Sequence, residues 1–134
     1  MSDRIERLTA QDLTQLSAAE FDAMPFGMIR LNRQGVVKVY NQWEATLARR
    51  NAQEVIGKNF FTDVAPCTNV AEFRGKLEEL FQGPTKTHIF DYNFAFPWGV
   101  RRVRVRFVVE SADECWVLVT NVDKAKPNLP ASAA

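Results

Sequence analysis

Histidine and cysteine are scarce in this sequence of 134 residues, and no apolar run is long enough to cross a bilayer. The single His88 and the widely separated Cys67 and Cys115 show none of the spacings that hold zinc, which argues against a metal site. Lys and Arg (17) exceed Asp and Glu (16) by one, so the overall charge favours neither nucleic acid nor an acidic partner. The first residues contain no apolar signal-peptide core. We therefore expect a cytoplasmic chain whose cysteines are free thiols, without metal, nucleic-acid or membrane partners.

Motifs for catalysis are missing as well. The sequence contains no Gly-rich phosphate loop and no evident Ser/His/Asp set, so we expect that the protein is not an enzyme. The composition, with 46% hydrophobic and 25% charged residues, is that of one globular domain. Ten phenylalanines stand out and indicate a core, or a pocket, built from aromatic rings.

The order of apolar patterns along the chain predicts an α+β domain. A helical lead-in over residues 9–24 comes first, a short helix follows Asn41, and an amphipathic helix is expected over residues 69–81. Strands are expected at residues 26–31, 36–40, 87–96, 102–109 and 115–122. Five such strands can close one antiparallel sheet with helices over one face, the pattern of a PAS fold with an N-terminal helical cap.

The same pattern divides the chain into three parts. We expect a helical cap over residues 1–24, a PAS-type domain over residues 25–123 and a disordered tail over residues 124–134. Four arginines alternate with, or flank, the apolar residues of the fourth strand, and we interpret them as a solvated outer face rather than a nucleic-acid site. They are Arg101, Arg102, Arg104 and Arg106.

Cys67 has two interpretations. It follows Pro66 and precedes Asn69, where a helix start would favour the thiolate form, so it is a candidate nucleophile or thioester site. A lone cysteine among apolar residues is more often an inert, buried side chain. Cys115, within the run C-W-V-L-V, is expected to be a strand residue without chemistry.

Glu44 and Tyr40 also have two interpretations. Glu44 lies three residues after Asn41, the spacing of a helix capping box. Alternatively, it is a buried carboxylic acid that stays neutral at pH 7 and donates a hydrogen bond to an anion, because burial raises the pKa of a carboxyl group. Tyr40, at the end of a strand, is either an ordinary half-buried residue or a second donor to that anion.

Several of these residues stand in motifs that resemble one family. The motifs are V-I-G-K-N-F-F-T-D-V-A-P-C-T at 55–68, Y-N-x-x-E at 40–44, F-D-Y-N-F at 90–94 and W-V at 116–117. They resemble the photoactive yellow proteins, blue-light receptors of the PAS superfamily. The resemblance implies p-coumaric acid (4-hydroxycinnamic acid) bound to Cys67 as a thioester, with Tyr40 and Glu44 donating hydrogen bonds to its phenolate. Arg50 would cover the mouth of the pocket.

The resemblance also implies aromatic pocket residues, and the sequence differs from the family at two positions. Phe60, Phe94 and Phe96 would line the pocket. Ala48 stands where the family commonly has a threonine, and Trp98 where many members have a methionine that helps the chromophore revert. Light would isomerise the double bond from trans to cis, and Glu44 would then pass its proton to the phenolate. The buried carboxylate left behind would drive release of the cap, which would signal to a downstream protein that the sequence does not identify.

Two other functions stay open at this point. A PAS module of the same fold, without chromophore, would act as a small-ligand sensor or protein-interaction domain, and Ala48 and Trp98 favour it. An acyl-transfer enzyme would use Cys67 as nucleophile, but it needs a general base, and His88 has no evident link to Cys67.

Overall fold

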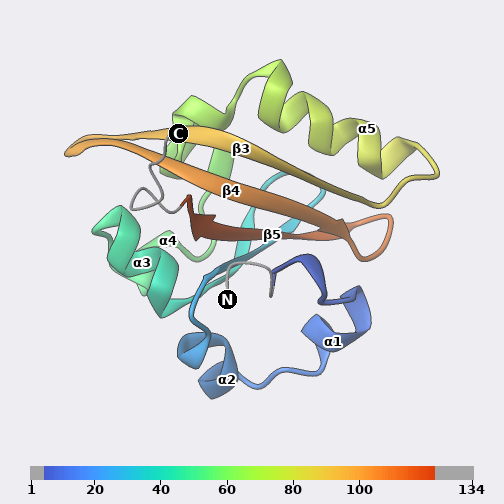
Figure 1. Ribbon diagram of the computed structural model, residues 1–134, viewed down its shortest axis with the longest axis horizontal. Helices are drawn as coiled ribbons and strands as arrows, with labels where there is room; N and C mark the ends of the chain where they lie inside the picture. Colours follow the sequence, from blue (N-terminus) through green and yellow to red (C-terminus); the bar gives the residue numbers. More distant parts are fainter. Residues whose placement is uncertain (1–4, 123–134) are drawn as a thin grey trace.

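The computed structural model describes residues 5–122, which fold around one antiparallel sheet of five strands. The strand order across the sheet is β2-β1-β5-β4-β3 (Figure 1), which confirms the predicted sheet. The strands are β1 (Gly27–Asn32), β2 (Val37–Tyr40), β3 (Thr87–Phe96), β4 (Gly99–Val109) and β5 (Glu114–Asn121). The tail predicted to be disordered, residues 124–134, lies outside the described residues. No helix within residues 5–122 is long and apolar enough to cross a membrane.

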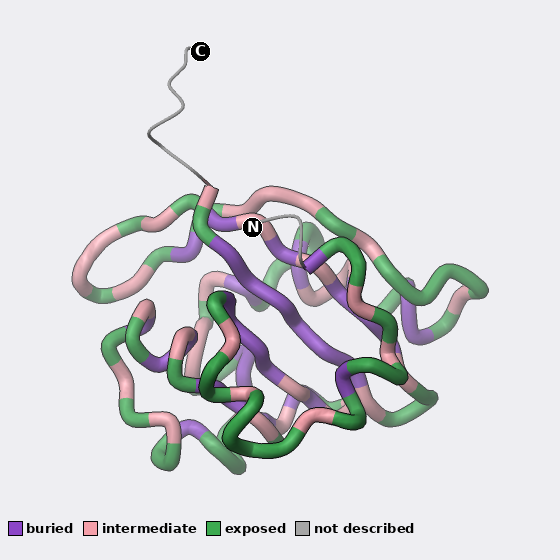
Figure 2. The backbone as a smooth tube through the Cα atoms, turned by 60° about the horizontal axis from the view of Figure 1, so that its bottom comes forward, coloured by how far each residue is buried: buried purple, intermediate pink, exposed green. Residues whose placement is uncertain are grey.

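Each face of the sheet carries its own core. Alternation along β4 places Val103, Val105 and Phe107 in the larger core, together with the helices between β2 and β3. Met28 of β1 and Trp116 of β5 belong to a smaller core on the opposite face. Successive residues of a strand point to opposite faces, so the central strands are buried on both sides. Figure 2 shows this as long buried stretches through the middle of the molecule.

The segment before β1 covers the smaller core. It forms two short helices, α1 (Ala10–Thr14) and α2 (Ala18–Ala23), rather than one helical stretch over residues 9–24. Each helix begins with a capping box, headed by Thr9 in α1 and by Ser17 in α2. Two N-cap signals in succession start two helices, because each directs the backbone out of the preceding one. We call residues 5–24 the cap.

The cap also changes the interpretation of the arginine-bearing face of β4. Arg106 Nη1 donates hydrogen bonds to the backbone carbonyls of Ile5 (2.8 Å) and Leu8 (2.5 Å). Arg104 pairs with Asp91 of β3 (2.8 Å). The prediction of a solvated face is therefore wrong for Arg106, whose partners lie 101 and 98 positions away in the sequence.

Short helices cover the larger core between β2 and β3. They are α3 (Gln42–Ala48), α4 (Ala52–Val55), the π-helical turn η2 (Phe60–Val64), the 3₁₀ turn η3 (Pro66–Thr68), the π-helical turn η4 (Ala71–Gly75) and α5 (Lys76–Gln82). The helix predicted over residues 69–81 therefore begins at Ala71, after Val70 in extended conformation. Its first turn is wide, with Gly75 N–H donating to Val70 O (3.2 Å).

Candidate functional site

Cys67 lies in η3, which contacts β3. The Tyr92 hydroxyl donates to the backbone carbonyl of Cys67 (2.5 Å), and the Ala95 N–H points at its Sγ (3.5 Å). The expected helix start at Asn69 is absent, because the Asn69 side chain accepts a hydrogen bond from Arg74 and the next helical turn begins at Ala71. The thiol is therefore held by β3 rather than by a helix N-terminus.

Cys67 opens onto a cavity of about 860 Å³. Four of the predicted site residues join it there: Arg50 from the segment after α3, Phe94 and Phe96 from β3, and Trp98 from the β3–β4 turn. We call this space the thiol cavity. Its lining is Ala48, Arg49, Arg50, Asp63, Val64, Ala65, Pro66, Cys67, Phe94, Ala95, Phe96, Pro97 and Trp98.

Arginine and aromatic side chains make up part of the lining of the thiol cavity. Arg50 Nη1 donates to the Val64 carbonyl (3.3 Å), which ties the end of α3 to η2. Trp98 stacks on Phe96 with ring centres 5.0 Å apart and planes 7° apart. The Arg49 guanidinium lies 4.3 Å from the Trp98 ring centre. Cation–π and stacking contacts of this kind hold flat groups against one another.

Phe60 lies elsewhere. It is 1% exposed and packs in the larger core against Phe61 and Phe73, with ring centres 5.5 and 6.1 Å apart. It is not among the residues that line the thiol cavity. The structure thus places it in the larger core rather than on the cavity surface.

Glu44 and Tyr40 are buried and are not among the residues that line the thiol cavity. Glu44 is one helical turn before Ala48 on α3, so the two side chains share a face and Ala48 is the one that reaches the cavity. Tyr40 is 6% exposed and lines a neighbouring hollow of about 600 Å³. Arg50 lines both spaces.

Only half of the expected capping box forms at Glu44. The Asn41 Oδ1 accepts from the Glu44 N–H (3.2 Å), as an N-cap does. The Asn41 N–H, however, donates to Met28 O (3.1 Å). The Glu44 carboxyl group therefore does not accept the second hydrogen bond of a capping box from the Asn41 N–H. That carboxyl is 2% exposed, and its Oε1 has no hydrogen-bond partner among the described residues.

Burial controls the protonation of this pair. It raises the pKa of Glu44 to about 8, because a charged carboxylate would lose its hydration without gaining a partner. Burial also raises the pKa of Tyr40, and the nearby Glu44 raises it further, while Arg50 opposes both effects. At pH 7 the site therefore holds a neutral acid beside a neutral phenol, two hydrogen-bond donors without a negative charge.

The sequence did not indicate the contacts that Asn41 and Gly27 make near Glu44. Asn41 was expected only as a cap, yet its Nδ2 also donates to the carbonyls of Phe21 (2.7 Å) and Phe26 (3.0 Å). Gly27, in β1, lies against Glu44 and leaves room for its carboxyl group. No local pattern marks either contact, since both join segments separated by more than a dozen residues.

Known proteins resemble this chain in sequence and in fold. The family described as PAS fold matches residues 15–118. Photoactive yellow protein from Rhodothalassium salexigens is 34% identical over 111 residues, which cover 82% of this chain and 89% of that protein. The chain belongs to the photoactive yellow protein family. Photoactive yellow protein from Cereibacter sphaeroides is also 34% identical, over 83% of this chain and 93% of its own.

Solved structures support the same assignment. The photoactive yellow protein domain of the sensor histidine kinase Ppr from Rhodospirillum centenum has a TM-score of 0.77 and 36% identity, and the match covers 84% of this chain and 99% of that domain. The PAS domain of the RpfR quorum-sensing receptor from Cronobacter turicensis, at 20% identity and a TM-score of 0.62, shares the fold alone. The predicted PAS fold and family are confirmed. The photoactive yellow proteins are photoreceptors and not enzymes, so the chain is a photoreceptor of this PAS type.

Other chemistry finds no support in the described residues. Within residues 5–122, no three His, Cys, Asp or Glu side chains are grouped to hold a metal ion. The residues that line the thiol cavity include no histidine. His88 instead stacks on Phe90 in β3, with ring centres 5.3 Å apart, so it is not placed as a general base for Cys67.

Proposed function

We propose that the chain senses blue light through p-coumaric acid held as a thioester on Cys67, with Tyr40 and Glu44 as hydrogen-bond donors to its phenolate. The observation that carries this proposal is the Glu44 carboxyl. It is a buried, neutral acid one helical turn from the wall of the cavity into which Cys67 opens, and its Oε1 has no partner within residues 5–122. A buried polar atom of this kind is a place where a bound group can form a hydrogen bond.

The residues around the thiol cavity fit such a group. Phe94, Phe96 and Trp98 offer flat apolar surfaces to an aromatic ring, and the cavity of about 860 Å³ is of the size that holds small ligands. When bound, p-coumaric acid supplies the absorption of blue light and the trans–cis isomerisation. Cys67 would hold it, and Tyr92 and Ala95 orient the Cys67 backbone and sulfur.

The chain's own part in the response is to hold and release one proton. Glu44 keeps its proton in the dark because its site is apolar. Loss of that proton toward the phenolate would leave a carboxylate that is almost fully buried and that forms no ion pair with any residue the structure describes. Such a charge costs a sizeable fraction of the stability of a small domain, so the structure around it would rearrange.

The contacts of Asn41 would carry that rearrangement to the cap. Asn41 binds the Glu44 N–H on one side and the Phe21 and Phe26 carbonyls on the other. The next residue adds a further link, since the Gln42 N–H donates to Asp22 Oδ1 (2.9 Å). A shift of the first turn of α3 would therefore loosen the cap and expose the smaller core to a downstream protein in the cytoplasm.

The first experiment is reconstitution. The purified protein is incubated with an activated p-coumaric ester, its mass and absorption spectrum are recorded, and it is then flashed with blue light. We expect added mass at Cys67, a band shifted to the red of the free acid, and bleaching that recovers in the dark. Absence of an adduct at Cys67 would overturn the proposal.

A second candidate is a chromophore-free PAS sensor of the same fold. Trp98 favours it, because this residue stands where many photoactive yellow proteins have the methionine that helps the chromophore revert. The PAS domain of RpfR, which was solved in complex with the small molecule BDSF, illustrates that use of the fold. An unmodified Cys67 after reconstitution would favour this alternative.

A further inference from the structure

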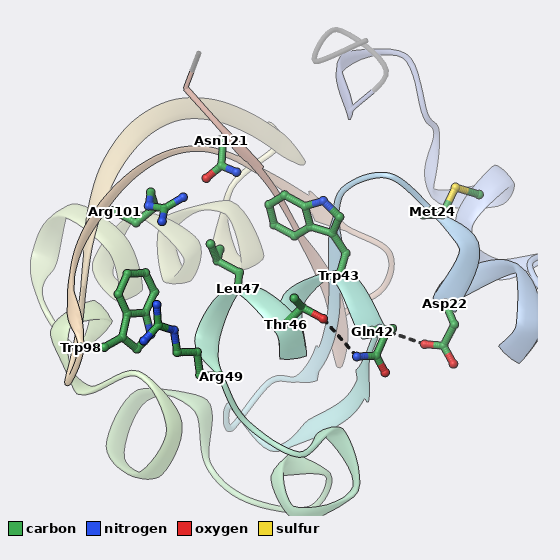
Figure 3. Close-up of a pocket in the computed structure, with 10 residues that line it drawn as sticks. All are labelled: Asp22, Met24, Gln42, Trp43, Thr46, Leu47, Arg49, Trp98, Arg101 and Asn121. Carbon is green, nitrogen blue, oxygen red and sulfur yellow. Dashed lines mark hydrogen bonds between the residues drawn. The ribbon is translucent and has the colours of Figure 1, made fainter. Parts of the chain in front are cut away.

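A second hollow lies on the outer side of the cavity wall, between α3 and the β3–β4 turn (Figure 3). Its volume is about 460 Å³, within the range of roughly 300–1,000 Å³ that is usual for small-molecule sites. We call it the outer groove. Arg49 and Trp98 line both this groove and the thiol cavity, so the two side chains form a partition between them.

The outer groove contains two guanidinium groups that have no counter-ion among the described residues. The Cζ atoms of Arg49 and Arg101 lie 4.3 and 5.3 Å from the centre of the Trp98 ring. Within residues 5–122 neither arginine forms an ion pair, in contrast to Arg104, which pairs with Asp91. Two like charges beside one ring repel each other, and the ring compensates only part of that repulsion.

The one carboxylate of the groove does not neutralise this pair. Asp22 lies at the opposite end of the groove from Trp98, as Figure 3 shows, and it accepts a hydrogen bond from the Gln42 backbone N–H (2.9 Å). The end of the groove near Trp98 therefore has a positive potential that an anion would neutralise.

One further feature of the partition is polar. Trp98 Nε1 is buried and has no hydrogen-bond partner among the described residues, so an indole N–H is without an acceptor. Arg49 directly follows α3 and has the left-handed backbone, with φ of 58°, that is common where a helix ends.

The remaining lining selects an aromatic ligand. Trp43 and Leu47 of α3 line the groove together with the Trp98 indole, and Figure 3 shows Leu47 between the two indoles. Flat apolar walls beside paired arginines suit a planar ring that bears a carboxylate, since a guanidinium binds a carboxylate through two parallel hydrogen bonds.

We propose that the outer groove is a noncovalent binding site for an aromatic carboxylate. Arg49 and Arg101 bind the carboxylate, and the surfaces of Trp43, Leu47 and Trp98 contact the ring. This site is separate from the thiol cavity and does not require a thioester on Cys67.

The test is a titration of the full chain with 3-phenylpropanoate, which has no activated carbonyl and forms no thioester. Isothermal calorimetry measures the affinity, and the indole N–H signals in a ¹H–¹⁵N spectrum report which tryptophans are contacted. We expect saturable binding that weakens with added salt, together with shifts of the Trp43 and Trp98 signals. The methyl ester, which keeps the ring and loses the charge, is expected to bind at least about tenfold more weakly.

A matched pair of variants locates the site. Arg101 lines the outer groove but not the thiol cavity, so Arg101→Gln is expected to weaken binding about tenfold or more. Arg102→Gln removes the neighbouring exposed charge, which contacts Asn93, and is expected to leave the affinity unchanged. Absence of saturable binding would overturn the proposal, as would equal affinities of the two variants.

The outcome is independent of chromophore attachment. A chain that binds 3-phenylpropanoate through Arg101 but forms no adduct with the activated ester would retain the outer groove and lose the proposed photoreceptor chemistry. A chain that forms a photoactive adduct but does not bind the acid would show the reverse.

Discussion

Gly27 of β1 and Glu44 of α3 are in direct contact, and a Cβ atom at position 27 would overlap Glu44 Oε1. The same atom would lie 3.1 Å from the Trp43 ring. The backbone of Gly27 needs no glycine for its conformation, since its φ is not in the left-handed region. Glycine is therefore required there for space, and it keeps room for a buried carboxyl group in the core of the site.

We therefore expect Gly27→Ala to displace the Glu44 carboxyl and to destabilise the protein by about 1–3 kcal/mol, as overpacking does. Urea unfolding measures the loss. Gly75→Ala is the control, because the nearest atom to a Cβ there would be the Ala71 Cβ, at 3.5 Å, and alanine favours helix. In a double-mutant cycle with Glu44→Ala, most of the cost of Gly27→Ala is expected to disappear. Equal effects of Gly27→Ala with and without the Glu44 carboxyl would contradict the steric explanation.

Glu44 also predicts how stability depends on pH. Its pKa rises from 4.5 in the unfolded chain to about 8 in the folded protein. Between these values the folded state holds a proton that the unfolded state has released. The contribution of Glu44 to the free energy of unfolding is therefore largest below pH 4.5. It decreases by about 1.4 kcal/mol per pH unit as the pH rises toward 8.

Glu44→Gln is expected to remove that slope from the chromophore-free protein. Urea unfolding between pH 5 and 8.5, in steps of about half a unit, measures it. Glu54→Gln is the control, because it makes the same substitution at an exposed position of α4. A wild-type slope in Glu44→Gln would mean that Glu44 is already ionised in the folded protein.

Local patterns predicted the sheet well. β3 spans residues 87–96 as expected, and β4 buries Val103, Val105 and Phe107 on one face, because a strand with two different faces has a period of two that the sequence displays. The helix after Cys67 was predicted less well. Its first turn is π-helical, and the i to i+5 bond between Val70 and Gly75 leaves no distinct pattern in the sequence.

The site was predictable only where chemistry and local pattern coincide. The order Tyr40, Glu44 and Cys67 could be recognised in the sequence. Whether Glu44 completes a capping box or is a buried acid could not be predicted, because this depends on the Met28 carbonyl accepting a hydrogen bond from the Asn41 N–H. The contact of Arg106 with the cap was unpredictable for the same reason. Local propensities do not indicate which distant segment of the chain covers a strand.

Tyr40→Phe tests the role of the phenol hydroxyl at almost constant volume. The reconstituted variant is expected to carry the same added mass, but loss of one donor raises the pKa of the bound phenol and increases its neutral form. A band at shorter wavelength should therefore grow at pH 7 in the absorption spectrum. Tyr92→Phe is the matched control, because its hydroxyl binds the Cys67 carbonyl instead. The same short-wavelength band in both variants would contradict the assignment of Tyr40.

Trp98→Met tests the cavity-wall position at which this chain has tryptophan and many photoactive yellow proteins have methionine. It removes the indole that stacks on Phe96 and replaces it with a flexible side chain, which we expect to accelerate dark recovery of the reconstituted protein. Flash absorption spectroscopy measures the rate. Trp43→Met is the control, since Trp43 lines the outer groove and not the thiol cavity. An unchanged recovery rate in Trp98→Met would refute the assignment.

Asn41→Ala tests the connection between the site and the cap. The side chain accepts from Met28 and Glu44 and donates to Phe21 and Phe26. Its loss removes an N-cap and leaves buried backbone groups unpaired, so we expect about 2–4 kcal/mol of destabilisation. Asn51→Ala, an exposed N-cap of α4 with one such bond, should cost only about 1 kcal/mol.

The location of the Asn41→Ala effect matters more than its size. If Asn41 joins α3 to the cap, amide exchange in residues 17–24 should accelerate more in this variant than exchange in β4 and β5. In Asn51→Ala the cap should keep its wild-type protection, because α4 has no hydrogen bond to it among the described contacts. Uniform acceleration over the whole chain would mean that Asn41→Ala weakens the domain globally, and the first turn of α3 would then not be the route from Glu44 to the cap.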